Sequence, residues 1–351
     1  MIYGLGIIGL GLIADFHARA IEEMTGGKLV ACLSRDRKKA SAFAEKYHCQ
    51  GYVSLEDFLS HPGLDIVTIC TPSGAHLEPA IQAAKAGKHL LIEKPLEITL
   101  KRCDQIIEAC EANNVKCSGI FQSRFFPLSF IIKDAIIQGR FGQLVLCDAY
   151  VKWQRNQAYY ENGGWHGTLR LDGGGALMNQ SIHAIDLLVY FAGDVIEVSG
   201  YVDTIGHHRI EVEDNAVTTL KFKNGALGVV EGSTSVYPGF LKRIEISGTD
   251  GSVILEEESL KAWDFRKKIE EDTLIIQQYS SDNTSGGGVS DPGAISFQGH
   301  KKQFEDMVKA IDENRQPFID GYEARKAVEI ILAIYQSAYK KKAIHLPLSY
   351  S

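Results

Sequence analysis

The sequence predicts an α/β fold with two domains: a doubly wound parallel sheet, followed by an α+β domain with a large, mainly antiparallel sheet. The 351 residues exceed the ~250–300 at which a single hydrophobic core stops growing. Short apolar runs alternate with helical stretches in the first third of the chain, whereas long strands follow one another later. We therefore expect the two domains to comprise residues 1–122 and 123–351.

Strands and helices alternate strictly in the first domain. The apolar runs at 67–70 and 90–93 lack a polar/apolar alternation, as is typical of strands that are buried on both faces. Because parallel strands need crossover connections, this order predicts a parallel sheet covered by helices. The expected strands are 3–8, 29–33, 66–70, 89–92 and 116–121, and the expected helices are 12–24, 38–47, 76–86 and 100–112.

The second domain changes this rhythm. Turn residues at 223–225 and 248–251 separate long strands and indicate hairpins, and hence an antiparallel sheet. The Gly/Ser/Asp-rich stretch 280–296 predicts a mobile loop. The expected strands are 144–151, 195–203, 215–222, 226–234 and 243–248, and the expected helices are 131–138, 176–191 and 324–340.

Composition excludes several classes of protein. The net charge of −7 argues against a nucleic-acid groove, and no apolar run approaches the ~20 residues of a membrane span. The seven cysteines form no Cys-x-x-Cys pair, so neither a metal site nor a disulfide is expected. Cys103 and Cys110 lie seven residues apart on an expected helix, which predicts that both are buried. A reducing, cytoplasmic compartment is expected.

Two overlapping glycine patterns compete for a dinucleotide-binding role. Gly4-x-Gly6-x-x-Gly9 leaves only three residues for a preceding strand, so it lacks the required context. Gly9-x-Gly11-x-x-Ala14 follows a strand and begins a helix, as that motif requires. Gly9 permits the tight turn, Gly11 lets the backbone approach a pyrophosphate, and Ala14 allows close helix–sheet packing. This turn predicts that a dinucleotide binds.

The end of the second strand predicts which dinucleotide is preferred. An NAD enzyme usually places a carboxylate here to bind the ribose hydroxyls. Ser34 and Arg35 instead suit the 2′-phosphate of NADP, although a solvated basic loop is the alternative. We expect NADP or NAD, with a slight preference for NADP. Thr71 and Pro72 end the strand 66–70 and are expected beside the nicotinamide half, unless they form an ordinary turn.

Two further segments carry residues suited to proton transfer. Lys94 follows the strand 89–92 directly, and Pro95 favours an extended backbone there; a surface lysine is the alternative. Asn179 and His183 are four residues apart and share a helix face, with Asp186 one turn further on. A purely structural histidine is the alternative.

The segment before this helix is rich in aromatic residues. Tyr160, Trp165 and Arg170 are candidates to bind a polyhydroxylated ring, because aromatic rings pack on CH faces and guanidinium groups bind hydroxyls. Packing beneath a loop is the alternative. Arg124, just after the strand 116–121, is a further candidate for substrate binding.

These motifs together resemble the Gfo/Idh/MocA family, named after glucose–fructose oxidoreductase, inositol dehydrogenase and a rhizopine catabolism protein. The pair EKP and GGG…H-x-x-D is the specific part of the resemblance. The matching segments are IIGLGLIADFH at 7–17, TPSGAH at 71–76, EKP at 93–95, GGGALMNQSIHAID at 173–186, and the stretches 213–233, 245–256 and 317–338.

The resemblance implies a Rossmann domain and an open-faced α/β domain whose sheet often forms oligomer contacts, so a homodimer or homotetramer is expected. It also implies hydride transfer between a nicotinamide and a hydroxyl-bearing carbon of a sugar, cyclitol, glycoside or sugar nucleotide. Lys94 would hydrogen-bond the reacting oxygen, and His183 would be the acid/base. Many relatives have Asp at position 179; neutral Asn179 cannot exchange a proton, so we expect it to orient the substrate.

By the same resemblance, residues of the first domain bind the cofactor. The predicted set is Gly9, Gly11, Leu12, Ile13, Ser34, Arg35, Thr71, Pro72, His76, Glu93 and Lys94. Two other functions are possible: a non-catalytic NAD(P)-sensing regulator, and a reductase of a non-sugar carbonyl or imine. The regulator predicts loss of Lys94 or His183, and both residues are present. An enzyme is therefore expected.

Overall fold

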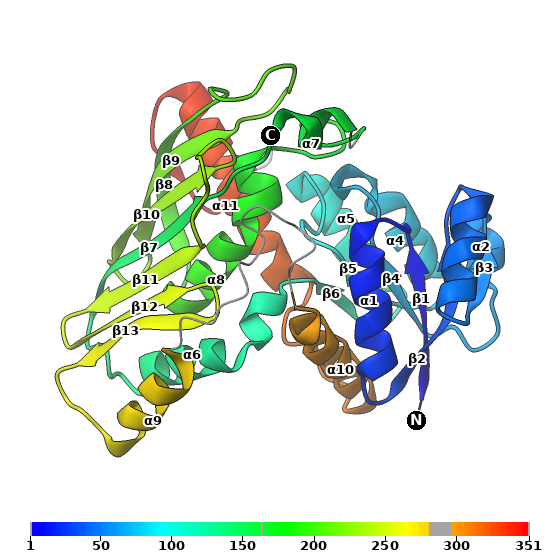
Figure 1. The fold of residues 1–351 in the computed structure, drawn as a ribbon, viewed down its shortest axis with the longest axis horizontal. Coiled ribbons are helices and arrows are strands. Elements are labelled where there is room, and N and C mark those ends of the chain that lie inside the picture. The colour runs from blue at the N-terminus through cyan, green and yellow to red at the C-terminus, as the bar shows by residue number, and fades with distance from the viewer. Residues whose placement is uncertain (1, 163, 281–295, 350–351) are drawn as a thin grey trace. The chain divides into compact units, whose positions relative to one another are not determined.

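A computed structural model describes residues 2–162, 164–280 and 296–349. The chain divides into two compact units (Figure 1). The first unit comprises Met1–Gln122 and Ser296–Val328, and the second comprises Ser123–Ile295 and Glu329–Ser351. The predicted domains share the division after residue 122, but the prediction placed residues 296–328 in the other domain.

The first unit contains a six-stranded parallel sheet with the order β3-β2-β1-β4-β5-β6. The strand order reverses at β1, which pairs with β2 on one side and β4 on the other, so the carboxyl ends of these strands form the topological switch point. This is the doubly wound sheet that the sequence predicts. The strands are β1 (Tyr3–Ile8), β2 (Gly27–Leu33), β3 (Gln50–Tyr52), β4 (Ile66–Ile69), β5 (His89–Ile92) and β6 (Cys117–Gly119).

Helices with local caps cover this sheet. The Asp36 carboxylate accepts hydrogen bonds from the second and third residues of α2, and the Thr99 hydroxyl caps α5. Cys103 and Cys110 of α5 are buried, as predicted. The helices are α1 (Leu12–Glu23), α2 (Arg37–Lys46), α3 (Leu55–Leu59), α4 (Leu77–Lys85), α5 (Leu100–Ala112) and α10 (Gln298–Asp312), with a 3₁₀ turn at Ser73–Ala75.

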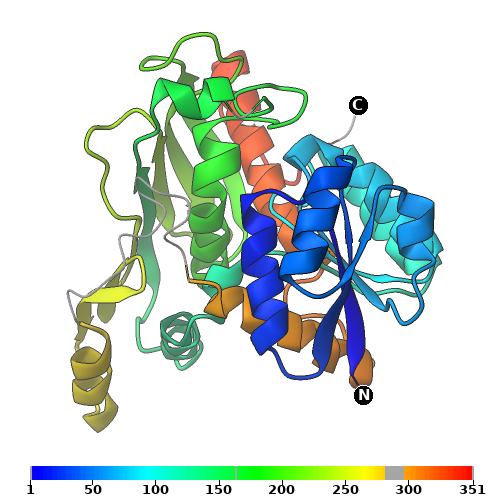
Figure 2. The same ribbon diagram turned by 45° about the vertical axis from the view of Figure 1, so that its right-hand side comes forward.

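The helix α10 explains why residues 296–328 belong to the first unit. It packs beside α1 (Figure 2). Phe304, Met307 and Val308 enter the same core as the strand residues Leu5 and Ile7. Their spacing of three and four residues is that of an amphipathic helix. The sequence prediction omitted this helix.

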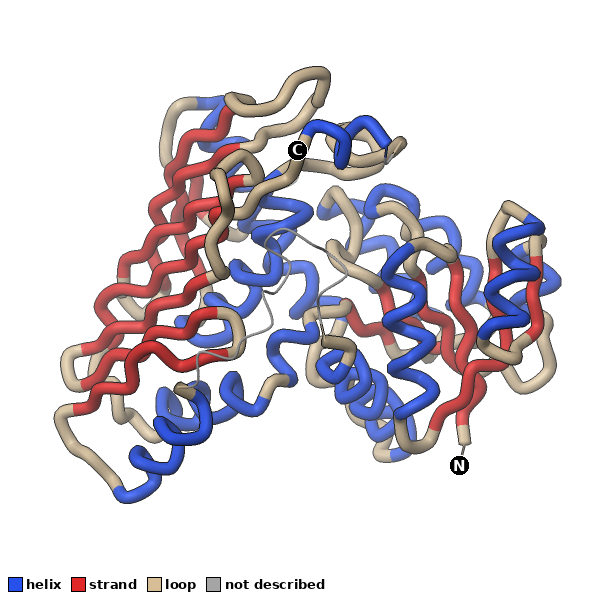
Figure 3. The backbone as a smooth tube through the Cα atoms, viewed as in Figure 1, coloured by secondary structure: helices blue, strands red, loops and turns tan. Residues whose placement is uncertain are grey.

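The second unit contains an eight-stranded sheet with the order β13-β12-β11-β7-β10-β9-β8-β14 (Figure 3). All its pairs are antiparallel except β7 with β10, so the prediction of a mainly antiparallel sheet is confirmed. The strands are β7 (Leu144–Lys152), β8 (Val195–Asp203), β9 (Asn215–Phe222), β10 (Leu227–Ser233), β11 (Arg243–Gly248), β12 (Gly251–Glu256), β13 (Ser259–Phe265) and β14 (Ile344–His345).

Helices contact one face of this sheet, and α8 packs on β7 and β11. The helical segments are a 3₁₀ turn at Gln122–Phe125, α6 (Pro127–Ile137), α7 (Gln157–Asn162), a π-helical turn (Ala176–Ser181), α8 (Ile182–Ala192), α9 (Glu270–Tyr279) and α11 (Gly321–Lys340), of which the part from Glu329 on belongs to this unit. On the opposite face, Tyr201, Val217 and Leu227 are exposed. Among the described residues, no helix is both long and apolar enough to cross a membrane. The loop predicted at 280–296 falls almost entirely outside the described residues.

Candidate active site

The glycine turn after β1 has the geometry of a phosphate-binding loop. Gly9 has φ +91°, and a Cβ there would lie 2.8 Å from the Cys70 carbonyl, so this turn requires glycine. Gly11 precedes α1, and no described atom beyond its chain neighbours lies within 4 Å of where its Cβ would be. The space beside Gly11 is therefore open at the start of α1, and the first N–H groups of a helix are a common binding site for phosphates. Gly4 and Gly6 lie inside β1 instead.

The other residues predicted to bind the cofactor lie at the carboxyl ends of the neighbouring strands. Leu12 is exposed and Ile13 half-buried at the start of α1. Ser34 follows β2, and Arg35 is exposed. The nearby Asp36 carboxylate accepts from two N–H groups of α2, at 2.8 and 3.3 Å, so it already serves as the cap of that helix.

His76 connects two loops rather than facing open space. Its side chain is fully buried; Nδ1 lies 3.0 Å from the carbonyl oxygen of Pro95, and Nε2 lies 2.9 Å from that of Thr71. Thr71 and Pro72 are half-buried, and the Thr71 hydroxyl donates to the Ala75 carbonyl. The sequence predicted a direct contact between His76 and the cofactor. This geometry instead favours a role for His76 in holding the two loops in position.

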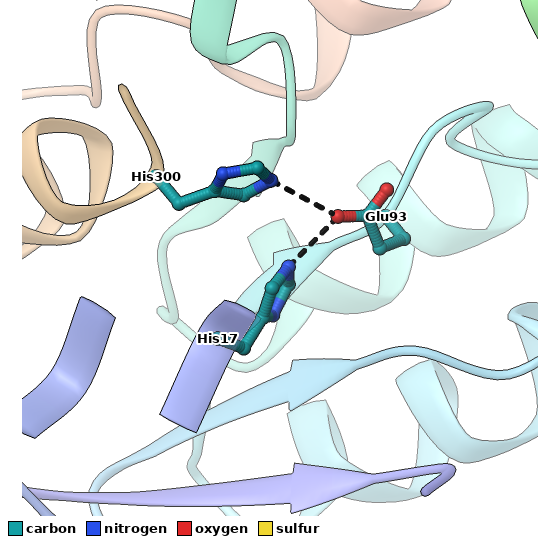
Figure 4. A group of neighbouring side chains, drawn as sticks. All are labelled: His17, Glu93 and His300. Carbon is teal, nitrogen blue, oxygen red and sulfur yellow. Dashed lines mark hydrogen bonds and ion pairs between the residues drawn. The ribbon is translucent and has the colours of Figure 1, made fainter. Parts of the chain in front are cut away.

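Glu93 belongs to a buried cluster with two histidines (Figure 4). Its Oε1 lies 2.8 Å from His17 Nε2 and 3.7 Å from His300 Nε2, and its Oε2 accepts from the backbone N–H of Lys94 at 3.1 Å. Burial by itself raises the pKa of Glu93, but the hydrogen bonds with both histidines hold that pKa well below its usual value. Glu93 is therefore an anion that fixes the backbone of Lys94.

The protonation of His17 follows from its surroundings. Burial lowers the pKa of His17, although Glu93 opposes this shift. The neutral ring can donate from Nε2 to Glu93 and accept at Nδ1 from the Thr68 hydroxyl, 2.8 Å away. Sequence analysis did not single out His17 or His300, although His17 ends the glycine-turn motif.

The atoms of this cluster bind one another rather than surrounding a position for a metal ion. Two imidazole nitrogens and a carboxylate oxygen lie within 4.8 Å of one another, and such donors are typical zinc ligands. However, the 2.8 Å between His17 Nε2 and Glu93 Oε1 is a hydrogen-bond distance. Two ligands at ~2.1 Å from a tetrahedral metal would be separated by roughly 3.4 Å.

Glu93 was predicted to bind the cofactor. In the structure its carboxylate contacts the backbone N–H of Lys94, and Lys94 is half-buried at the end of β5.

In the second unit, Asn179 lies on the π-helical turn and His183 on α8. Such turns are rare and occur frequently at functional sites. The Asn179 Nδ2 group donates to Asp172 Oδ1 at 2.6 Å, and Asp172 Oδ2 accepts from the Gly167 N–H at 2.8 Å. Asp172 is buried. This bond directs the Asn179 amide nitrogen toward Asp172, a partner that sequence analysis missed. His183 is half-buried.

Asp186 and Arg124 form a buried ion pair. Arg124 donates from Nε and Nη2 to the two Asp186 oxygens at 2.9 and 2.7 Å, and its guanidinium group lies over the ring of Tyr190. Arg124, predicted to bind substrate, therefore holds α8 from a buried position. Asp186 lies on α8 with His183, as predicted, and its two oxygens accept from Arg124.

The aromatic residues divide into a buried and an accessible set. Tyr160 is buried, its hydroxyl lies 2.8 Å from Thr234 Oγ1, and burial raises its pKa to about 12. This geometry favours the packing alternative for Tyr160. Trp165 is half-buried, and Arg170 is exposed.

Trp165 belongs to a stack that continues toward the π-helical turn. Its ring centroid lies 4.0 Å from that of His166, which stacks on Tyr159 at 4.3 Å. Arg155 lies over the Tyr159 ring, and Gln180 donates to the Tyr159 hydroxyl at 3.3 Å. We call Trp165, His166, Tyr159 and Arg155 the aromatic cluster. Gln180 joins it to the turn that carries Asn179, whereas sequence analysis named only Trp165.

Comparisons with known proteins identify the family. Residues 3–121 match the model of the Gfo/Idh/MocA oxidoreductase family with an NAD-binding Rossmann fold, and residues 131–254 match the Gfo/Idh/MocA C-terminal domain. The chain belongs to the Gfo/Idh/MocA family. It is an oxidoreductase of the dehydrogenase/reductase type with an NAD-binding Rossmann domain.

Among relatives of this Gfo/Idh/MocA protein, myo-inositol 2-dehydrogenase of Thermotoga maritima is 24% identical over 97% of the chain and 98% of its own length. The scyllo-inositol 2-dehydrogenase (NAD(+)) of Bacillus subtilis is 29% identical over 71% of the chain and 72% of its own length. The structure of the WlbA dehydrogenase of Bordetella pertussis, solved with NADH and UDP-GlcNAcA, matches 99% of this chain and 100% of its own chain. The two are 28% identical, with a TM-score of 0.88. The predicted family, fold class and dinucleotide cofactor are thereby confirmed, and the preference for NADP stays a prediction.

Proposed function

We propose that this Gfo/Idh/MocA enzyme transfers a hydride between a nicotinamide and a hydroxyl-bearing carbon of a sugar, cyclitol, glycoside or sugar nucleotide. The observation that carries the proposal is the anchored Asn179 amide on the same helical segment as His183, joined through Gln180 to the aromatic cluster. Polar groups of fixed orientation beside flat rings suit a ring with hydroxyls at its edge and CH groups on its face.

NAD(P), when bound, supplies the nicotinamide C4 that accepts or gives the hydride. His183 accepts the hydroxyl proton during oxidation and returns it during reduction, since an imidazole titrates near neutral pH. The Lys94 ammonium group hydrogen-bonds the reacting oxygen and stabilises the negative charge that develops there. Glu93 holds the Lys94 backbone for this task through its 3.1 Å hydrogen bond.

Asn179 orients the substrate. The bond from its Nδ2 to Asp172 fixes the orientation of the amide, and Oδ1 is the amide atom that can accept a hydrogen bond from a substrate hydroxyl. The ligands and substrates named for the relatives support a cyclic, polyhydroxylated compound: inositols and UDP-GlcNAcA all carry such a ring.

A substrate panel tests this proposal. Inositols, free hexoses, glycosides and sugar nucleotides are each incubated with NAD and NADP, and the absorbance of the reduced nicotinamide is followed. We expect turnover with one of these classes. Cofactor binding without turnover of any of these classes would contradict the proposal. Reduction of an imine or a non-sugar ketone in a parallel assay would then support a reductase of a non-sugar substrate. If no compound is turned over in either assay, the result would support the NAD(P)-sensing regulator.

A further inference from the structure

A residue from a distant part of the chain caps the N-terminus of the π-helical turn. Glu213, which lies two residues before β9, accepts hydrogen bonds from three consecutive N–H groups. Gly175 N–H donates to its Oε2 at 2.9 Å, Ala176 N–H to its backbone carbonyl at 3.0 Å, and Leu177 N–H to its Oε1 at 2.8 Å. The first N–H groups of a helix have no partner within the helix and are usually capped by the residue just before it. Here the cap comes from a residue 36 positions beyond Leu177.

This close approach explains the glycines before the turn. A Cβ at Gly175 would overlap the Glu213 carbonyl group, and a Cβ at Gly174 would overlap the Tyr335 hydroxyl. Tyr335, on α11, donates to Glu213 Oε1 at 2.9 Å. By residue type alone, a glycine triplet before a helix can either admit a ligand closely or form an unusual loop. In this structure Glu213 and Tyr335 fill the space beside two of the three glycines.

The cap matters because the π-helical turn contains an extra residue relative to an α-helix. An α-helix advances ~100° per residue. If the turn relaxed to α-helical hydrogen bonding, the residues before the change would rotate by about that angle relative to α8. Asn179 and Gln180 lie within the turn and His183 lies beyond it, so such a relaxation would separate the side chains that the turn aligns.

We propose that Glu213 is a positioning residue that holds the π-helical turn in the conformation presenting Asn179 and Gln180 alongside His183. This inference rests on the proposed function in assigning those side chains to the substrate. Glu213 itself acts through the backbone of the turn, and its carboxylate is buried behind the glycine triplet.

The surroundings of Glu213 contain acidic and phenolic groups. Tyr335 of α11 donates to Glu213, and Tyr160 of α7 lies close enough for the charges of Glu213 and Asp172 to act on it. The adjacent Asp214 carboxylate instead accepts from Ile205, Gly206 and His207. Burial raises the pKa of Glu213 to about 7, although its hydrogen bonds with Leu177, Gly175 and Tyr335 oppose the shift. Protonation near neutral pH can be accommodated, because a protonated oxygen can donate to the Tyr335 hydroxyl while both backbone N–H groups keep an acceptor.

The substitution Glu213→Gln removes the negative charge of this residue together with part of the cap. Whichever way the new amide is oriented, its NH₂ group faces one of the two N–H donors, Gly175 or Leu177, so one cap is lost. Asp272→Asn is the matched control: the Asp272 carboxylate also accepts three hydrogen bonds, from Arg140, Trp263 and Ile269, beside β13.

Hydrogen exchange of the amides at 175 and 177, followed by NMR or mass spectrometry, measures the cap directly. We expect Glu213→Gln to accelerate exchange at one of these amides at least about tenfold and to lower kcat by about tenfold to a hundredfold, as a 1 Å misplacement can do. The Kd for NADH should not change, because the glycine turn lies in the first unit. Asp272→Asn should lower the Tm and change neither exchange at these amides nor kcat.

Unchanged exchange, or accelerated exchange with unchanged kcat, would overturn the inference. Should Glu213→Gln fail to fold, Glu213→Asp tests the same cap, because it withdraws the carboxylate by one methylene and keeps its charge. Because exchange needs no substrate, failure of the proposed function is recognised separately, as an absence of turnover by the unmodified enzyme on the whole substrate panel.

Discussion

At the scale of single residues, Asn179 shows how one substitution relative to the family pattern is accommodated. The family resemblance implies Asp at this position, and here the neutral amide donates to the buried Asp172 carboxylate at 2.6 Å. The acidic group is therefore present beside position 179 rather than at it. Sequence analysis could identify the departure, but not its partner, because Asp172 lies seven positions away before the glycine triplet.

Restoring the family residue should destabilise this protein. Asn179→Asp places two carboxylates within hydrogen-bond distance in a buried setting, where they cannot both ionise without cost. We expect the free energy of unfolding to fall by about 1–3 kcal/mol at pH 8, and by less at pH 5, where the pair can share a proton. Denaturant unfolding at both pH values measures this.

The exchanged pair Asp172→Asn with Asn179→Asp is the control for that experiment. It keeps one amide and one carboxylate, and we expect it to recover most of the lost stability as a coupling energy between the two sites. Equal stability of Asn179→Asp and the unmodified enzyme at pH 8 would contradict the assigned contact.

Arg35 is the residue on which the choice of dinucleotide depends. A 2′-phosphate bound by its guanidinium group forms a charge-assisted hydrogen bond of about 1.5–3 kcal/mol. We expect Arg35→Ala to raise the Kd for NADPH at least about tenfold and to leave the Kd for NADH nearly unchanged. Fluorescence titration measures both constants, and Arg37→Ala, an exposed arginine at the start of α2, is the control. A parallel loss for both dinucleotides would remove Arg35 from the 2′ site.

At the scale of elements, local sequence patterns predicted most of the fold. The bounds of β5, α5, β8, β9 and β11 are those expected, because each is a periodic run between clear turn or cap residues. The helix expected at 176–191 starts instead as a π-helical turn, and its first N–H groups are capped by Glu213 from outside the segment. Nothing within the segment itself encodes that cap.

The parts of the site that sequence analysis missed depend on distant pairing. His300 lies on α10, which was not predicted, and it contacts Glu93 only because that helix packs against α1 in the folded chain. Conversely, Tyr160 and Arg124 have the residue types that bind sugars, yet tertiary contacts with Thr234 and Asp186 occupy their polar groups. In each case the residue type suggested sugar binding, but in the folded chain the polar group is buried and bonded within the protein.

The buried cluster of His17, Glu93 and His300 should make the first unit sensitive to acid. The folded-state pKa values of Glu93 and His17 are both lowered, so the unfolded chain binds more protons at acidic pH. The stability linked to His17 is lost as pH falls below ~6.5, and that linked to Glu93 as pH falls below ~4.5. The enzyme should therefore lose stability between pH 7 and pH 5.

Replacing His17 tests this linkage. His17→Leu leaves the buried Glu93 carboxylate without its 2.8 Å donor, so we expect a loss of about 1–3 kcal/mol at pH 7. The loss should be smaller at pH 5. There the unmodified enzyme is itself destabilised by protonation of His17 in the unfolded chain, and the leucine variant is not. Denaturant unfolding at the two pH values provides the measurement, with His345→Leu, an exposed histidine, as control. A loss that is independent of pH would contradict the assigned neutral His17.

At the scale of the whole molecule, the two units carry separable tasks. The first unit contains the glycine turn and the other residues assigned to the dinucleotide, together with Lys94. The second carries Asn179, His183, the aromatic cluster and the Glu213 cap. The second unit also has an open sheet face with exposed Tyr201 and Val217; the expected homodimer or homotetramer stays a prediction. Substitutions of Asn179 or His183 should accordingly change turnover and leave cofactor affinity unchanged.

The central claim is that His183 exchanges the proton of the reacting hydroxyl, and its most direct test is the turnover of His183→Ala with the substrate identified by the panel. We predict that turnover falls by at least about a hundredfold, as loss of a general acid/base does, while the Kd for the dinucleotide and the Tm remain those of the control His345→Ala. Near-normal turnover by His183→Ala, with the cofactor bound as before, would contradict the account.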